Sequence, residues 1–276
     1  MLTHQFALAQ APQVDVHLIG AGGTGSHVLS GLVDIAMTLP HVKRQSINVT
    51  VWDSDTVSTA NLGRQRFYPA DVGANKAEVL VHRINAFFGL NFVAKPCRLT
   101  ATSYLEKSYG RKKIVIGCVD SAAARRTIGE WVKNNTFAYW LDCGNTSSTA
   151  QAVLGQPLYH HGHNDVYGRL PTVLELFPTL RDASVPDDDQ PSCSVAEAIQ
   201  KQDLTVNRAS AQAALEILWT LLRQGSISYS AKFVNTRSGQ VSTLRVDPKA
   251  WRRFGHIGKR KPPTRKTISS DNTKAA

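Results

Sequence analysis

Four glycines between an apolar run and a helical pattern are the first residues whose spacing suits chemistry. Residues 14–19 are followed by GAGGTGS, in which Gly20, Gly22 and Gly25 satisfy G-x-G-x-x-G and Gly23 stands between them. Such a turn lets backbone N–H groups approach a phosphate at the N-terminus of a helix. The spacing predicts a site for NAD, FAD or ATP, although a purely structural turn also fits it.

Polar residues that suit a bound nucleotide follow the glycines. Asp53 ends the second predicted strand, where a carboxylate can accept hydrogen bonds from ribose hydroxyls. Cationic side chains stabilise charge on phosphoryl oxygens, and a carboxylate can hold Mg²⁺ beside them. The candidates of these types are Asp55, Asn61, Arg64, Gln65, Lys76 and Asp120. A solvated polar loop is the structural alternative for the set, and a helix N-cap is the alternative for Asp120.

The elements that must position these residues alternate along the chain. Hydrophobic periodicity predicts strands at residues 14–19, 47–52, 91–95, 113–119 and 137–142. It predicts intervening helices at residues 24–39, 76–88 and 122–132, the first of them ended by Pro40. This alternation is typical of an α/β fold with a Rossmann-like, mostly parallel sheet flanked by helices.

The C-terminal part of the chain has a different pattern. A helix at 205–223 precedes two strands, at 228–234 and 241–246, which predict an antiparallel hairpin at the sheet edge. Residues 155–191, which hold prolines and an acidic run, predict a crossover or lid loop. Residues 1–248 are thus expected to form one domain, followed by a basic, disordered tail at 249–276.

The charge of the chain is concentrated in that tail. The formal net charge is +11, and the residues from 249 onward carry nine Lys or Arg and one Asp. The net charge of the remaining body is close to ordinary for a domain of its size, which argues against a nucleic-acid-binding fold. The tail could still dock an acidic protein or nucleic acid.

Composition indicates a soluble cytoplasmic protein. The sequence contains no run of 18 apolar residues, so no membrane span is predicted. The first residues lack the pattern of a signal peptide. The four cysteines include no C-x-x-C pair, which favours reduced thiols over a disulfide framework or a tetrahedral zinc site. Three of them, Cys97, Cys118 and Cys143, lie on or beside predicted strands and are expected in the core.

Cys193 is a candidate nucleophile. It lies in Pro-Ser-Cys-Ser-Val at residues 191–195, just before a predicted helix at 195–200. A cysteine at a helix N-terminus can have a lowered pKa, which favours the reactive thiolate. A small buried residue is the alternative. The nearby His160, His161 and His163 have no matching Cys/His pair, so a solvated loop is preferred to a metal site.

Three segments together resemble a known family. GAGGTGS, WDSDTVSTANLGRQRFYPADVGANKAEV and IGCVDSAAAR are similar to the ThiF, MoeB and ubiquitin-activating adenylation domains, and the likeness spans residues 14–247. The resemblance implies an ATP-dependent adenylyltransferase. Such an enzyme activates the C-terminal carboxylate of a small ubiquitin-like protein, ending in glycine, as an acyl-adenylate.

The resemblance also assigns roles to individual residues. It implies that Asp53 binds ribose, that Asn61, Arg64 and Lys76 contact the phosphates, and that Asp120 holds Mg²⁺. The segment at 191–195 resembles the P-x-C-T-[IV] element of ubiquitin-activating enzymes. That likeness implies a further step, transfer of the activated protein to Cys193 as a thioester.

Within the family, the pattern most resembles the ThiF-family protein of PRTRC clusters. This likeness implies a JAB-type protease and a conjugating-enzyme-like protein as partners, and the wider family implies a homodimer. Two features depart from the family pattern. No Lys or Arg precedes Lys43, so an arginine upstream of the glycine loop is missing, and so are the paired zinc motifs of the MoeB and ThiF branch.

Two other functions compete with adenylation. One is an NAD(P)-dependent oxidoreductase of Rossmann type, whose fingerprint does not require the N-x-x-R-Q set or Lys76. The other is a non-catalytic subunit of a heterodimeric activating enzyme, against which the presence of Arg64, Lys76 and Asp120 argues.

Overall fold

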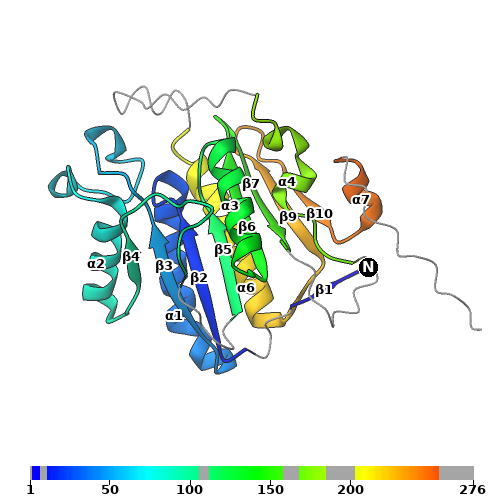
Figure 1. Ribbon diagram of the computed structural model, residues 1–276, viewed down its shortest axis with the longest axis horizontal. Coiled ribbons are helices and arrows are strands. Elements are labelled where there is room, and N and C mark those ends of the chain that lie inside the picture. The colour runs from blue at the N-terminus through cyan, green and yellow to red at the C-terminus, as the bar shows by residue number, and fades with distance from the viewer. Residues whose placement is uncertain (1, 7–10, 106–111, 158–167, 185–202, 255–276) are drawn as a thin grey trace, which may run out of the picture.

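An eight-stranded mixed sheet forms the centre of the molecule (Figure 1). The computed structural model describes residues 2–6, 11–105, 112–157, 168–184 and 203–254. The strand order is β10-β9-β7-β6-β5-β2-β3-β4, and β1 pairs with β8 in a separate two-stranded sheet. The strands are β1 (His4–Gln5), β2 (Gln13–Ile19), β3 (Ser46–Trp52), β4 (Val93–Lys95), β5 (Lys112–Gly117), β6 (Tyr139–Asn145), β7 (Thr149–Gly155), β8 (Ser226–Ile227), β9 (Tyr229–Asn235) and β10 (Val241–Arg245).

Five neighbouring strands of the sheet, β4, β3, β2, β5 and β6, run parallel. The chain leaves β2 for β3 and β4 on one side and then returns to β5 on the other side. The order therefore reverses between β2 and β5, where a crevice opens beyond the carboxyl ends of the strands. The antiparallel strands β7, β9 and β10 complete the opposite end.

Helices cover both faces of the sheet. They are α1 (Gly23–Lys43), α2 (Lys76–Phe88), α3 (Ala122–Asn134), α4 (Val173–Leu176), α6 (Val206–Gln224) and α7 (Pro248–Arg252), with 3₁₀ turns η1 (Thr59–Asn61), η2 (Pro69–Asp71) and η3 (Pro178–Arg181). Helix α1 connects β2 to β3, and α3 connects β5 to β6, so the two connections run toward opposite edges of the sheet. Because both are right-handed, α1 and α3 lie on opposite faces. Helix α6 packs beside α1 and over β6 and β7, so residues from distant parts of the sequence share one layer.

The packing of α1 on α6 depends on a glycine. A Cβ placed at Gly31 would lie 2.2 Å from the Leu215 side chain. Inward residues of both helices are apolar, including Leu29, Leu32 and Leu218. Burial of this layer fixes the start of α6 next to the start of α1, which matters for the site described below.

The predicted mostly parallel α/β architecture and the antiparallel C-terminal strands are confirmed. Helix α1 does not end at Pro40, which lies within the helix. A proline removes the hydrogen bond to the carbonyl four residues earlier, and its ring crowds that carbonyl, yet here one more turn follows before Arg44 adopts a left-handed conformation. Strand β7 was not predicted, because its alanines and glycine carry a weak strand signal.

Parts of the predicted loop and tail are built into the body. Within 155–191, residues 168–184 form α4 and η3 against α3, and Leu170 and Leu176 are buried. Residues 249–254 continue from β10, and Trp251 is only 1% exposed. Residue Gly155 ends β7, and residues 158–167, 185–191 and 255–276 of the predicted lid and tail lie outside the described residues. In the described part, no helix is long and apolar enough to cross a membrane.

An aromatic cluster surrounds a buried histidine in β2. The His17 ring lies against Trp131 and Phe137, and its Nδ1 accepts a hydrogen bond from Trp52 Nε1 at 3.3 Å. Burial lowers the pKa of His17 to about 4, with a smaller opposing effect of Asp15. The imidazole is therefore neutral in the folded protein at neutral pH.

This histidine should make stability depend on pH. Between about pH 6.5 and 4 the unfolded chain binds a proton that the folded chain excludes, so stability is lost as pH falls through that window. The loss of stability from one such group is about 3 kcal/mol for the shift to a pKa of about 4. Thermal unfolding at pH 7.5 and 4.5 should show a smaller drop in Tm for His17→Gln than for the wild type. His82, exposed on α2, gives the control: His82→Gln should keep the wild-type drop, and equal slopes in both variants would contradict the assignment.

Candidate functional site

A cavity of about 480 Å³ lies at the carboxyl ends of β2, β3 and β5, where the strand order reverses. This volume is in the range of small-molecule sites. Nine of the residues predicted for the nucleotide site line it: Gly20, Gly22, Gly23, Asp53, Asp55, Arg64, Gln65, Lys76 and Asp120. Residues spread over a hundred positions of sequence thus meet in one place, as the parallel topology requires.

The glycine turn is shaped by two close backbone contacts. Gly20 has φ +89°, and a Cβ there would lie 2.7 Å from the carbonyl oxygen of Cys118. A Cβ at Gly25 would lie 1.9 Å from the Gly20 carbonyl oxygen. Gly25 does not line the cavity in the described part of the chain, so its place is in the packing of the turn against α1.

Helix α1 presents an open N-terminus to the cavity. Gly22 is its N-cap and offers no side-chain acceptor, and no acidic residue occupies the first turn. The first N–H groups of the helix and its dipole therefore favour an anion in front of them. The glycines supply the approach and the helix supplies the partial positive charge.

Asp53 ties the glycine turn to the end of β3. Its Oδ2 accepts from the Ala21 N–H at 2.6 Å, and its Oδ1 accepts from the Asp55 N–H at 2.8 Å. Burial raises the pKa of Asp53, against the opposing effects of these N–H groups and of Lys76. Each carboxylate oxygen has a second lone pair, so the residue can brace the loop and still accept from a ligand hydroxyl.

Two of the cations that line the cavity, Arg64 and Lys76, were predicted from the sequence and come from different elements. Lys76, the first residue of α2, has a side chain 10% exposed, and its Nζ lies 3.0 Å from Asp55 Oδ2. Burial lowers the pKa of Arg64, and the charge of Asp120 opposes that shift, but a guanidinium remains protonated in a protein. Both are positioned for an anionic ligand in a partly desolvated site.

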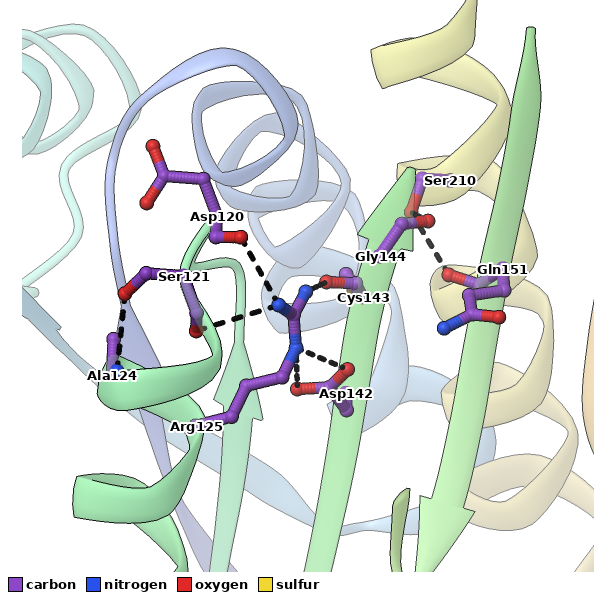
Figure 2. Close-up of polar contacts among 9 residues, drawn as sticks. All are labelled: Asp120, Ser121, Ala124, Arg125, Asp142, Cys143, Gly144, Gln151 and Ser210. Carbon is purple, nitrogen blue, oxygen red and sulfur yellow. Dashed lines mark hydrogen bonds and ion pairs between the residues drawn. The ribbon is translucent and has the colours of Figure 1, made fainter. Parts of the chain in front are cut away.

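Asp120 is held by its backbone, and its carboxylate is exposed (Figure 2). Arg125 Nη1 donates to the Asp120 carbonyl at 3.3 Å, and Arg125 Nε donates to both oxygens of the fully buried Asp142, at 3.3 and 3.1 Å. The N-cap of α3 is Ser121, whose Oγ accepts from the Ala124 N–H at 3.1 Å. The N-cap alternative for Asp120 is thus wrong, and its carboxylate is left for another role.

Several predicted residues lie elsewhere. Asn61 does not line the cavity in the described part of the chain, and its Oδ1 instead caps η1 by accepting from the Ser58 N–H at 2.9 Å. Cys193 and the three loop histidines lie outside the described residues. Cys97, Cys118 and Cys143 line the cavity, and Cys97 is exposed, so its expected place in the core is wrong. Burial raises the pKa of Cys118 well above its usual value, so that thiol stays protonated.

Among the cavity residues that escaped sequence analysis are three that contact one another: Thr24, Asn145 and Asn207. Asn207 Oδ1 accepts from Thr24 Oγ1 at 3.1 Å and from Asn145 Nδ2 at 2.6 Å. These residues come from α1, β6 and α6, and no shared spacing links them. The position of Asn207 at the start of a helix was the sole local signal, and it does not indicate a ligand.

A second cavity of about 410 Å³ adjoins the first along β7, β9 and β10. Its lining includes Arg125, Gln151, Phe233 and Asn235. Asn145 lines both cavities, so the two meet at the end of β6.

The described residues contain no group of three or more His, Cys, Asp or Glu side chains that could hold a metal ion. A Mg²⁺ ion commonly binds through one or two carboxylates together with substrate phosphates. Asp120 fits that smaller role, whereas a metal site made by protein side chains alone does not fit the described part of the chain.

The contrast between Asp120 and its neighbour can be measured. Ser121→Ala should lower the free energy of unfolding by about 1 kcal/mol, because it removes the cap of α3. Asp120→Ala should change it by less than about 0.5 kcal/mol, because the lost carboxylate is exposed and caps nothing. Urea denaturation measures both. Equal losses would show that the Asp120 carboxylate is part of the fold.

Comparison with solved structures shows the same fold in other proteins. Selenomethionine PaaA superposes with a TM-score of 0.54 at 14% identity, over 86% of this chain and 65% of PaaA. E. coli MccB with AMPCPP and selenomethionine MccA gives 0.56 at 15% identity, over 86% and 66% of the two chains. The microcin C7 biosynthetic enzyme MccB in complex with N-formylated MccA gives 0.56 at 17%, over 86% and 67%.

The chain thus spans just under two thirds of the length of PaaA and of the E. coli MccB structure with AMPCPP. No curated protein matches the sequence. The sequence itself matches the ThiF family over residues 5–252, which is most of its length. On that match, the chain belongs to the ThiF family.

Proposed function

We propose that this protein is an ATP-dependent adenylyltransferase that activates the C-terminal carboxylate of a small partner protein as an acyl-adenylate. The observation that carries the proposal is the convergence of Arg64, Lys76 and Asp120 with the open N-terminus of α1 in one cavity. Such a set suits a polyphosphate. MccB has been solved with ATP, which supports the same ligand here.

The cavity offers polar atoms that a nucleotide would satisfy. Gln65 Oε1 and Asn207 Nδ2 are buried and have no hydrogen-bond partner among the described residues. Buried polar groups are normally paired, so unpaired ones in a cavity wall point to a polar ligand. Together with Asp53 at the end of β3, these atoms fit a nucleotide.

The proposed reaction needs little covalent chemistry from the protein. A carboxylate oxygen of the partner forms a bond to the α-phosphorus, the bond from that phosphorus to the bridging oxygen breaks, and pyrophosphate leaves with the electron pair. Negative charge grows on the phosphoryl oxygens and on pyrophosphate. Arg64 and Lys76 stabilise that charge, and positioning of the two reactants supplies much of the rate.

Mg²⁺ would be held by Asp120 together with the phosphates, and it would neutralise part of their charge. The Asp120 side chain lies near Arg64, so a carboxylate and a cation stand side by side at the expected phosphate position. No nucleophile of this chain takes part in the adenylation step. The second cavity, which meets the first at Asn145, is where the partner's C-terminal segment would approach.

The nature of the partner is proposed from the sequence resemblance. A ubiquitin-like protein ending in glycine suits the second cavity, since a residue without a side chain lets the terminal carboxylate enter closest. The MccB structures with MccA provide a parallel in which a family fold holds a second molecule. A PRTRC-type context, with a JAB-type protease, a conjugating-enzyme-like protein, a cytoplasmic location and a homodimer, completes the proposal.

Partner-dependent ATP–pyrophosphate exchange tests the proposed reaction. Arg64→Ala and Lys76→Ala should each lower kcat/KM, because each removes a preorganised charge stabiliser. The expected loss of transition-state stabilisation is about 2–4 kcal/mol for each variant. Asp120→Ala should abolish exchange while leaving the fold intact. Candidate small proteins ending in glycine serve as substrates.

Lys133, exposed at the C-terminal end of α3, gives the control, and Lys133→Ala should exchange at the wild-type rate. Nucleotide selectivity checks the competing oxidoreductase function. ATP should raise Tm, whereas NAD(P) should not. Binding of NAD(P) in place of ATP, or wild-type exchange by a well-folded Asp120→Ala variant, would contradict the proposal.

Thioester transfer is a separate proposal about Cys193. Adenylation does not need the thiol, so Cys193→Ala should keep pyrophosphate exchange and lose a thiol-sensitive covalent complex with the partner. Non-reducing electrophoresis after incubation with ATP and partner measures the complex, and Cys97→Ala is the control. Persistence of the complex in Cys193→Ala, or its absence in the wild type, would contradict thioester transfer to Cys193.

A further inference from the structure

Asn207 is held in one orientation at the wall of the nucleotide cavity. It lies in the first turn of α6 and is only 2% exposed. Its Oδ1 accepts from Asn145 Nδ2 at 2.6 Å and from Thr24 Oγ1 at 3.1 Å. A rotated amide would set Asn207 Nδ2 against the Asn145 Nδ2 donor, whereas the Thr24 hydroxyl can donate or accept, so the contact with Asn145 selects the orientation.

In this orientation, the Nδ2 donor of Asn207 makes no hydrogen bond that stabilises the described part of the fold. Nδ2 is buried and has no acceptor within the part of the chain that the structure describes. A buried donor without an acceptor is costly, and proteins retain such groups where a ligand supplies the acceptor. The missing partner must be an oxygen or another acceptor that enters the cavity.

The surroundings specify the charge and the place of that acceptor. A Cβ at Gly23 would lie 2.8 Å from Asn207 Nδ2, so the amide lies directly against the start of α1. The N-terminus of a helix favours an anion. Asn145, bonded to Asn207, lines both cavities, so the amide lies near their meeting point.

We propose that Asn207 is a catalytic residue whose Nδ2 donates a hydrogen bond to an anionic oxygen at the junction of the two cavities. This inference rests on the proposed function, in which the partner's carboxylate meets the α-phosphoryl group at that junction. The acceptor is an oxygen of the α-phosphoryl group or of the acyl group joined to it. In either case the donor holds the reacting pair together as charge develops.

A series of three adenosine compounds tests the assignment without the partner protein. Adenosine lacks the anionic group, AMP carries it, and glycyl-sulfamoyl adenosine carries an acyl group joined to a sulfamate, which stands in for the phosphoryl group. Asn207→Asp is the main variant, because its carboxylate still accepts from Thr24 and Asn145 but offers no donor. Isothermal titration calorimetry measures the affinity of each compound for the wild type and the variant.

For one step of the series, the ratio of the two affinities should fall by about tenfold or more in Asn207→Asp relative to the wild type. Hydrogen bonds to charged acceptors are the stronger class, so the loss of one is measurable. If the acceptor is the α-phosphoryl oxygen, the variant loses the preference for AMP over adenosine. If it is the acyl oxygen, the variant keeps that preference and loses the gain from the glycyl group. Both results support the proposal.

Two further variants separate the donor from other effects. Asn207→Ala removes the donor without adding charge, so it should lose the same step of the series as Asn207→Asp. Asn134→Asp makes the same substitution on the exposed surface of α3 and should bind all three compounds as the wild type does. A purely structural role would instead weaken the binding of all three compounds to Asn207→Ala, adenosine included, and leave the ratios between their affinities near those of the wild type.

Failure of this inference is distinct from failure of the proposed function. A wild type that shows the full series, with an Asn207→Asp variant that shows it unchanged, overturns the role of Asn207 alone. A well-folded wild type that binds none of the three compounds overturns the adenylation site, and the role of Asn207 with it.

Discussion

The ion pair between Arg125 and Asp142 fixes the geometry on which the site depends. Asp142 is fully buried in β6, and Arg125 reaches it from α3 while also donating to the carbonyls of Asp120 and Cys143 (Figure 2). One guanidinium therefore joins the loop after β5, the helix after that loop, and the next strand. Removal of one partner from such a pair costs roughly 3–5 kcal/mol, because the remaining charge is left buried.

The position of this pair explains why both cavities share one wall. The Asp120 backbone is held on one side of Arg125, and the end of β6, with Asn145, is held on the other. Ser210 of α6 adds a second constraint by donating to the Gly144 and Gln151 carbonyls at 3.3 and 3.0 Å, as Figure 2 shows. The nucleotide cavity and its neighbour are thus set by the same few buried polar contacts.

Residues in contiguous motifs were predictable from the sequence, and residues assembled by long-range packing were not. The glycine turn, Asp53 and Lys76 follow directly after strands or begin a helix, so local pattern places them. Asn207 reaches the cavity only because α6 packs on α1, which no spacing reveals. Strand β7 and the extra turn of α1 after Pro40 escaped for a related reason, since tertiary packing overrides weak local propensity.

The contact between Thr24 and Asn207 also has a consequence for synthesis on the ribosome. The two residues are 183 positions apart, so at usual elongation rates roughly 10–40 s separate their appearance. During that interval the glycine turn and the strands around it exist without α6. The layer of α1 that α6 later covers, including Leu29 and Leu32, lacks its apolar neighbour. The emerging chain therefore has an incomplete nucleotide site and an uncovered apolar face, of the kind that chaperones recognise, until α6 has been made.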